Sequence, residues 1–119
     1  MIDTIHYILV RRDLPFGVTL AMVAHAAALS TNSYHRTVAV LGVRNEKELR
    51  KRSMKLHGNK VKHTTVFDSN PYYEGQMLSI GIPPASRSEL SHLVSDLATY
   101  REFEGPEPQD VVGAFVEAQ

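Results

Sequence analysis

Residues 7–28 constrain the fold most, because they indicate a buried strand, a sharp turn and an alanine-rich helix in immediate succession. Residues 5–11 are apolar at almost every position, which is typical of a strand covered on both faces of an α/β sheet. Pro15 and Gly17 then interrupt the strand pattern and favour a tight turn. Alanine dominates residues 18–31, so this stretch predicts a helix, and its nearly uniform apolar character predicts that the helix is largely buried.

Three later stretches carry the apolar and β-branched composition of strands. They are residues 37–43, 62–67 and 76–82. Between the first two, Asn45 and Glu48 stand at the N-cap and N3 positions of a predicted helix, where their side chains can satisfy free backbone N–H groups. This helix runs to about His57, and the glycine that follows is a common helix end.

Prolines separate the last predicted elements. Pro83 and Pro84 are expected to stop the fourth strand, and Ser86 or Ser88 is expected to cap a third helix. Alternating strands and helices form right-handed crossovers and a mostly parallel sheet, whereas the short link at residues 68–75 joins the last two strands as an antiparallel hairpin. We therefore predict an α/β fold with three layers: a four-stranded mixed sheet with helices on both faces.

The length of 119 residues suits a single domain, residues 1–119, with its core at about 5–97. Residues 102–119 form an acidic, proline-containing extension, in which residues 110–117 carry several large apolar side chains. Such side chains gain free energy by leaving water. We therefore expect the extension to dock on the body of the domain or on a second subunit of a homodimer.

The amino-acid composition excludes several kinds of site and limits where the protein is expected to act. The chain has no cysteine, which excludes a disulfide framework, a thiolate zinc site and a cysteine nucleophile. The sequence shows neither a basic leader nor a run of about 18 apolar residues, so we expect a soluble, cytoplasmic protein that does not enter a membrane. Net charge is zero, but eight of the 13 lysine and arginine residues lie between Arg44 and Lys62. This clustering indicates either a solvated helix face or a local basic surface.

His25 is the first candidate for chemistry, because a histidine in a helix of alanine and valine is unusual. It is either a core histidine bonded to a polar neighbour or a group that exchanges protons near neutral pH. Asp68 and Asp13 each follow a predicted strand, where a carboxylate either orients a water or a histidine or simply ties a turn. Gly17 and the N–H of Val18 open a helix, and free N–H groups there can hold a phosphate or an oxyanion.

Other residue patterns exclude several kinds of site. No two histidines have metal-ligand spacing on a predicted helix, so we predict no metal. There is no glycine-rich phosphate loop, no cofactor is expected, and the absence of a Gly-x-Ser-x-Gly turn argues against a serine hydrolase of that kind. Tyr72 beside Tyr73 either stacks on a base or covers an edge of the core.

A family resemblance rests on three of these features: Leu-Val-Arg-Arg-Asp-Leu at residues 9–14, Gly17, and the helix with His25-Ala-Ala. Together they resemble the opening of the type 2 peptidyl-tRNA hydrolases. The strand–helix–strand run at residues 38–67 and Asp68 at its end are similar to the same family. The resemblance implies a peptidyl-tRNA-hydrolase-type fold and hydrolysis of the ester bond between a peptidyl group and tRNA. His25 and Asp68 would position the water, and amides near Gly17 would hold the oxyanion.

The resemblance also implies a set of substrate-binding residues, with the arginine and the two lysines meeting tRNA phosphates. They are Arg12, Asp13, Gly17, Val18, Met22, Lys51, Lys55 and Tyr72. Val18 stands where the family has a lysine, and Met22 stands where it has a glutamine, so one helix stripe has become apolar. Loss of one electrostatic donor costs on the order of 100–1000-fold in rate. The alternative is therefore a non-catalytic or differently catalytic member of the fold, which binds a small ligand or a protein partner near His25.

Overall fold

The structure is a computed structural model that describes residues 4–31, 37–67 and 71–100. Its strands and helices follow one another in the predicted order, with one short 3-10 helix in addition. They are β1 (Thr4–Arg11), α1 (Phe16–Ser30), β2 (Val38–Val43), α2 (Glu46–Gly58), β3 (Thr64–Phe67), η1 (Pro71–Tyr73), β4 (Met77–Ser86) and α3 (Arg87–Val94). The side chain of Asn45 caps α2 as predicted. Ser86 holds the N-cap position of α3, but its hydroxyl caps no backbone N–H and donates to Glu89 Oε1 at 2.8 Å instead.

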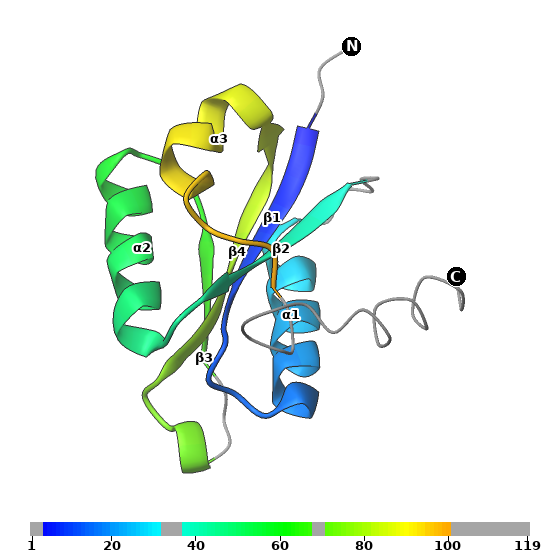
Figure 1. Ribbon diagram of the computed structural model, residues 1–119, viewed down its shortest axis with the longest axis vertical. Helices are drawn as coiled ribbons and strands as arrows, with labels where there is room; N and C mark the ends of the chain where they lie inside the picture. Colours follow the sequence, from blue (N-terminus) through cyan, green and yellow to red (C-terminus); the bar gives the residue numbers. More distant parts are fainter. Residues whose placement is uncertain (1–3, 32–36, 68–70, 101–119) are drawn as a thin grey trace.

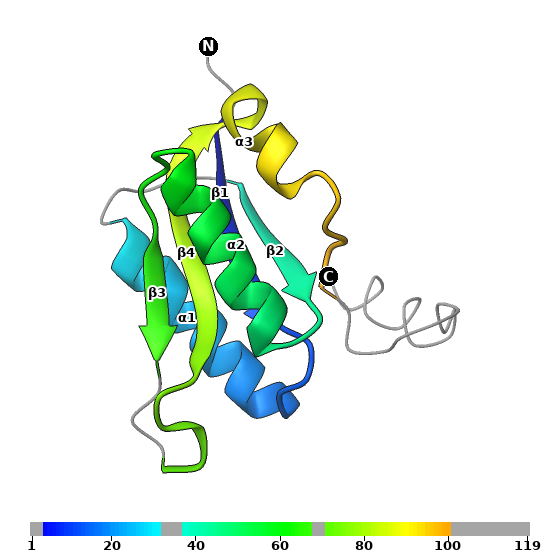
Figure 2. The ribbon, with the colours of Figure 1, turned by 90° about the vertical axis from the view of Figure 1, so that its left-hand side faces the viewer.

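The four strands form one mixed sheet in the order β2-β1-β4-β3 (Figure 1). β1 and β2 are parallel, whereas β4 runs antiparallel to both of its neighbours, β1 and β3. Helix α1 covers one face of the sheet, and α2 and α3 cover the other face (Figure 2). This arrangement confirms the predicted α/β fold with three layers and helices on both faces of a four-stranded mixed sheet.

Strand β1 lies at the centre of the core and is buried on both faces. Successive side chains of a strand point to opposite faces, so Leu9 packs under α2 and α3, whereas Ile8 and Val10 pack under α1. All three are completely buried, and each such side chain contributes about 1.5–3 kcal/mol to folding. Burial on both faces explains why this strand is a continuous apolar run rather than an alternating one.

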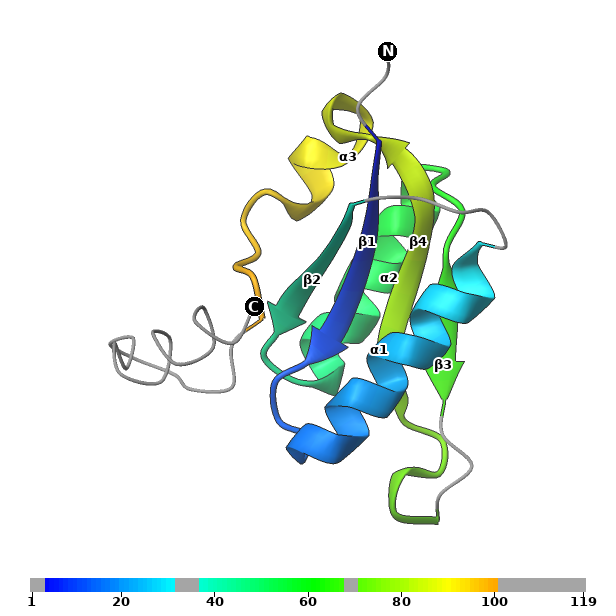
Figure 3. The same ribbon diagram turned by 90° about the vertical axis from the view of Figure 1, so that its right-hand side faces the viewer.

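Helix α1 is buried along one side only, so the expectation of a largely buried helix is wrong. Its buried residues are Thr19, Met22, Ala26 and Ser30. Relative to a stripe through Val18, Met22, His25 and Leu29, the buried side is rotated by about one residue, which leaves His25 exposed and Leu29 61% exposed. A single sheet face covers only part of a helix's circumference, and in the described part of the chain no further element covers the outer side of α1 (Figure 3).

Strand β4 continues through Pro83 and Pro84, so the expectation that these prolines stop it is also wrong. The register between β1 and β4 shifts at this point, so that His6 of β1 lies opposite both prolines in a bulge. A bulge tolerates proline because its residues need not donate to the ladder. The His6 N–H points the other way and donates to the Thr37 carbonyl at 2.9 Å.

Helix α1 lies unusually close to β4 at Gly81. A Cβ atom at Gly81 would lie 2.3 Å from the Ala26 carbonyl oxygen and 2.6 Å from Ser30 Oγ. Ser30 Oγ donates to that carbonyl at 2.7 Å and bonds to Nε2 of the buried His6 at 2.6 Å. The distance between helix and sheet is therefore set by a glycine on one side and by alanine and serine on the other.

Residues 98–100 extend the sheet at the free edge of β2. The Gly42 N–H donates to the Ala98 carbonyl, and the Tyr100 N–H donates to the Val40 carbonyl, each at 2.9 Å. The contact is an antiparallel bridge centred on Thr99. No local pattern in the sequence indicates this pairing, which brings the chain after α3 back along the sheet.

Candidate functional site

A pocket opens at the carboxyl edge of the parallel strands β1 and β2, which is where open α/β sheets usually bind ligands. Its volume is about 740 Å3, and it is open to solvent. The walls come from the turn after β1, the end of β2, the first turns of α2 and the residues after α3. The charged residues of the lining are Arg12, Asp13, Arg44, Glu48, Arg52 and Asp96.

Local hydrogen bonds bring these walls together. The N–H of Arg12 donates to the Val43 carbonyl at 2.8 Å, which continues the parallel pairing to the very end of the two strands. Arg12 and Arg44 therefore leave the sheet at the same edge. Asn45 then begins α2 at once, because its Oδ1 accepts a hydrogen bond from the Glu48 N–H at 3.1 Å.

Gly42 makes room for the side chain of Arg12. A Cβ atom at Gly42 would lie 2.4 Å from Arg12 Nε and 3.1 Å from Arg12 Cζ, so the guanidinium rests against the bare backbone of β2. A guanidinium that is held in this way is oriented before a ligand arrives. Its planar set of donors matches the oxygens of a carboxylate or a phosphate.

The two aspartates of the pocket are already paired with arginines. Asp13 accepts hydrogen bonds from Nε and Nη2 of Arg11 at 2.8 and 3.0 Å. Asp96 accepts two from Arg52, one of them from Nη1 at 2.8 Å. The hydrogen bond from Arg52 lowers the pKa of Asp96, and the same contact raises the pKa of Arg52. Each of the two aspartates therefore forms an ion pair with one arginine.

The third carboxylate of the lining is also close to a cation. Glu48 Oε1 lies 3.7 Å from Lys51 Nζ on the exposed side of α2. Arg12 and Arg44 supply two further cations to the lining. The arrangement can attract and orient an anion.

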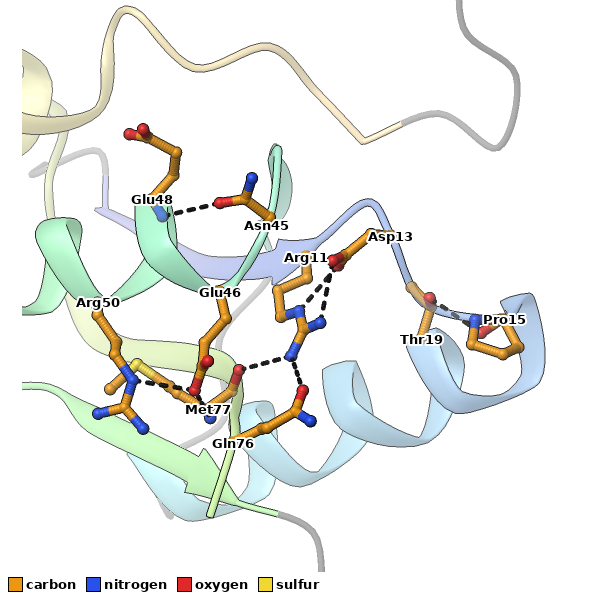
Figure 4. A network of polar contacts seen from close by, with 10 residues as sticks. All are labelled: Arg11, Asp13, Pro15, Thr19, Asn45, Glu46, Glu48, Arg50, Gln76 and Met77. Carbon is orange, nitrogen blue, oxygen red and sulfur yellow. Dashed lines mark hydrogen bonds and ion pairs between the residues drawn. The ribbon is translucent and has the colours of Figure 1, made fainter. Parts of the chain in front are cut away.

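Behind the pocket, buried Arg11 ties the end of β1 to the start of β4 (Figure 4). Its Nη1 donates to Gln76 Oε1 at 2.8 Å and to the Met77 carbonyl at 3.4 Å. From α2, Glu46 Oε2 accepts from the Met77 N–H at 2.8 Å and from Arg50 Nε at 2.9 Å. The Met77 N–H, followed by Arg50, lowers the pKa of Glu46. This network joins β1, α2 and the start of β4, and through Arg11 it holds Asp13 of the pocket lining.

The two predicted catalytic residues are not brought together in the described part of the chain. His25 lies on the exposed side of α1 and does not line the pocket. Asp68 lies outside the described residues. Strand β3 ends just before it, at Phe67, on the same edge of the sheet as the end of β1, since both strands are antiparallel to β4. The joint action of His25 and Asp68 stays a prediction.

The predicted substrate-binding residues divide between the pocket and the helices. Arg12 and Asp13 line the pocket. Gly17 is exposed and Val18 is half-buried on α1, whereas Met22 is buried between α1 and the sheet, where a ligand does not reach it. The apolar stripe of α1 is therefore partly core and partly outer surface, and it is not the wall of the pocket.

Lys51, Lys55 and Tyr72 lie on the exposed surface outside the pocket lining. Lys51 is the nearest in sequence to the lining residues of α2, and Tyr72 is 87% exposed in η1. Sequence reasoning missed Gly42, although an isolated glycine in a strand often marks a close approach by another group. It also missed Arg52 paired with Asp96, because 44 residues separate the two and no local pattern links them.

Within the described residues, no group of three or more histidine, aspartate or glutamate residues is arranged to hold a metal ion. Among the helices of the same ranges, none has the length and apolar character needed to cross a membrane.

Comparison with known proteins gives a structural similarity without a function. No known family matches the sequence, and no curated protein matches it. Among solved structures, the chain is similar to Atu0240, a protein of unknown function from Agrobacterium tumefaciens strain C58. The TM-score is 0.57 at 12% identity, and the match covers 85% of this chain and 100% of that one. At this identity the similarity supports the fold alone.

Proposed function

We propose that the pocket beside Gly42 binds an anionic ligand that carries a phosphate group. The observation that carries the proposal is the position of Arg12, whose guanidinium lies across the side-chain-free backbone of Gly42 and lines the pocket. Its donors form a rigid plane that suits two oxygens of one phosphate. The volume of about 740 Å3 lies within the range of roughly 300–1,000 Å3 that is common for small-molecule sites.

The arginines of the site support an anion. The lining carries three arginines, Arg12, Arg44 and Arg52, and three carboxylates, so its formal charge is balanced. Guanidinium groups bind phosphate oxygens through several donors at once. A phosphate with three terminal oxygens can therefore contact more than one of these arginines, which favours it over a single carboxylate.

Binding measurements with the full chain test this proposal. Adenosine monophosphate and pyrophosphate are titrated into the protein at low salt, and affinity is followed by calorimetry. Arg12→Gln and Arg44→Gln should each weaken binding by roughly tenfold or more, because each removes a charge-assisted hydrogen bond. Lys60→Gln makes the same charge change at an exposed position outside the lining and should leave affinity unchanged. Equal affinities in all four proteins would refute the proposal.

A second candidate function is hydrolysis of the ester between a peptidyl group and tRNA in the cytoplasm. The observation that favours it is that Arg12 and Asp13, from the motif that resembles the type 2 peptidyl-tRNA hydrolases, line the pocket. The acceptor end of tRNA would supply the phosphate. The exposed position of His25, outside the lining, favours binding over hydrolysis. If the activity exists, Asp68 and His25 would position the water.

Release of an N-blocked amino acid from charged tRNA separates the two functions. Turnover by the wild-type protein that falls in both His25→Ala and Asp68→Asn supports the hydrolase. No turnover by folded protein at low salt and high enzyme concentration leaves only binding. If charged tRNA binds without turnover, its affinity should fall steeply as salt rises, because phosphate contacts release counterions.

A further inference from the structure

The layer of helices on the α1 side of the sheet is incomplete. Helix α1 packs over β1, β4 and β3, while the other face carries two helices, α2 and α3. Figure 3 shows β2 beside α1 rather than beneath it. The surface of β2 on this side is formed by Val38 and Val40, two apolar residues typical of a covered strand.

Large apolar side chains are exposed along this gap. Val38 is 47% exposed, and on the helix Phe16 is 46% and Leu20 is 56% exposed. Helix α1 has no charged residue along its entire length. A surface helix normally turns charged side chains to water, so a charge-free helix beside an uncovered strand is typical of an interface.

Leu20 is one of the exposed residues of α1 and lies on the flank that faces β2, whereas the exposed residues His25 and Leu29 lie on the flank toward β3. Leu20, Val23 and Ala27 are spaced by three and four residues and therefore share one side of the helix. The opposite flank meets β3, since Thr64 Oγ1 donates to the Leu29 carbonyl at 3.4 Å. The gap is thus a strip with α1 on one side, β2 on the other, and partly buried Val23 and Ala27 along it.

We propose that residues 110–117 of the same chain dock in this strip and complete the layer. The described chain ends in the right place, because Tyr100 pairs with Val40 and packs against the core on the α1 side. The ten residues 101–110 can span up to roughly 33 Å. Helix α1, with 15 residues, is only about 22 Å long, so the segment reaches every part of the strip.

The sequence of residues 110–117 suits docking in an apolar strip. Its large apolar residues are spaced so that a helix would place all of them on one face: Val111, Val112, Phe115 and Val116. The acidic residues Asp110 and Glu117 fall on the opposite face of the same helix. An amphipathic segment of this kind gains free energy only when its apolar face finds a partner. The strip lies beside Tyr100, where the described chain ends, and so offers such a partner.

A single spin label tests the docking. The chain has no cysteine, so Ala114→Cys gives one site, on the polar side of the segment, for a nitroxide on the full-length protein. Amide signals of residues 20–27 and 38–40 should broaden severalfold more than those of residues 50–57 on the opposite layer. Adding Val112→Asp should abolish this preference, because a buried charge shifts docking by roughly tenfold or more. Gly113→Asp adds the same charge on the polar side of the segment and should preserve it.

Three outcomes would overturn the proposal. The first is uniform broadening, or none, which would mean that the segment has no preferred site. The second is an unchanged pattern in Val112→Asp, which would mean that the apolar face does not make the contact. The third concerns a mixture of spin-labelled molecules and isotope-enriched molecules that carry no label. If signals of the enriched molecules broaden in the strip, the strip belongs to the segment of a second copy.

Discussion

Replacing Gly81 by alanine should separate α1 from the sheet and strongly destabilise the fold. The new Cβ would lie 2.3 Å from the Ala26 carbonyl oxygen and 2.7 Å from Ser30 Cβ. The first of these atoms belongs to the helix backbone, so the clash cannot be relieved by turning a side chain. Overpacking of a core costs about 1–3 kcal/mol. Displacement of Ser30 also breaks its buried bond to His6 at 2.6 Å, which adds about 1–3 kcal/mol.

The free energy of unfolding, measured by urea titration with circular dichroism, should therefore fall by about 3 kcal/mol or more. Gly17→Ala is the matched control, because the same methyl group meets nothing within 4 Å at Gly17. That change should be neutral or stabilising by up to about 1 kcal/mol, since alanine is the better helix former. An ordinary surface substitution changes the free energy of unfolding by no more than about 0.5 kcal/mol. If Gly81→Ala changes it by as little, the close approach of α1 to β4 is not a feature of the protein.

Three further predictions concern the pocket and the network beside it. Gly42→Ala should displace the Arg12 side chain, which its Cβ would meet at 2.4 Å, and should weaken phosphate binding by roughly tenfold while the unfolding free energy changes little; a titration with pyrophosphate measures the affinity, and urea unfolding measures the stability. Arg11→Met should cost about 2 kcal/mol, because it removes buried charge-assisted hydrogen bonds, and urea unfolding measures it. The pKa values of Glu46 and Asp96 are lowered in the fold, so their stabilisation is present above the usual carboxyl pKa of about 4 and is lost as pH falls below it; a series of unfolding curves from neutral to acidic pH should show this decline, and a flat profile would contradict it.

The sequence predicted part of the candidate site and missed the rest for a clear reason. Arg12 and Asp13 were found because they follow a strand that is recognisable from its own residues. Arg52 and Asp96 were missed because their contact joins α2 to the chain after α3. His25 was predicted to be either a core histidine or a group that exchanges protons, and the structure leaves it exposed. A helix that is apolar all round carries no periodicity to show which side meets the sheet.

The sequence by itself determined the order of strands and helices, the caps of α2 and the three-layer α/β fold, because these follow from patterns within a few residues of one another. Tertiary structure alone decided the continuation of β4 through Pro83 and Pro84, since only the pairing partner shows that a bulge removes the need for their N–H groups. It also decided that residues 98–100 return along β2 and that the side chain of Arg12 lies over Gly42. These features depend on which distant segments meet, and no local pattern encodes that.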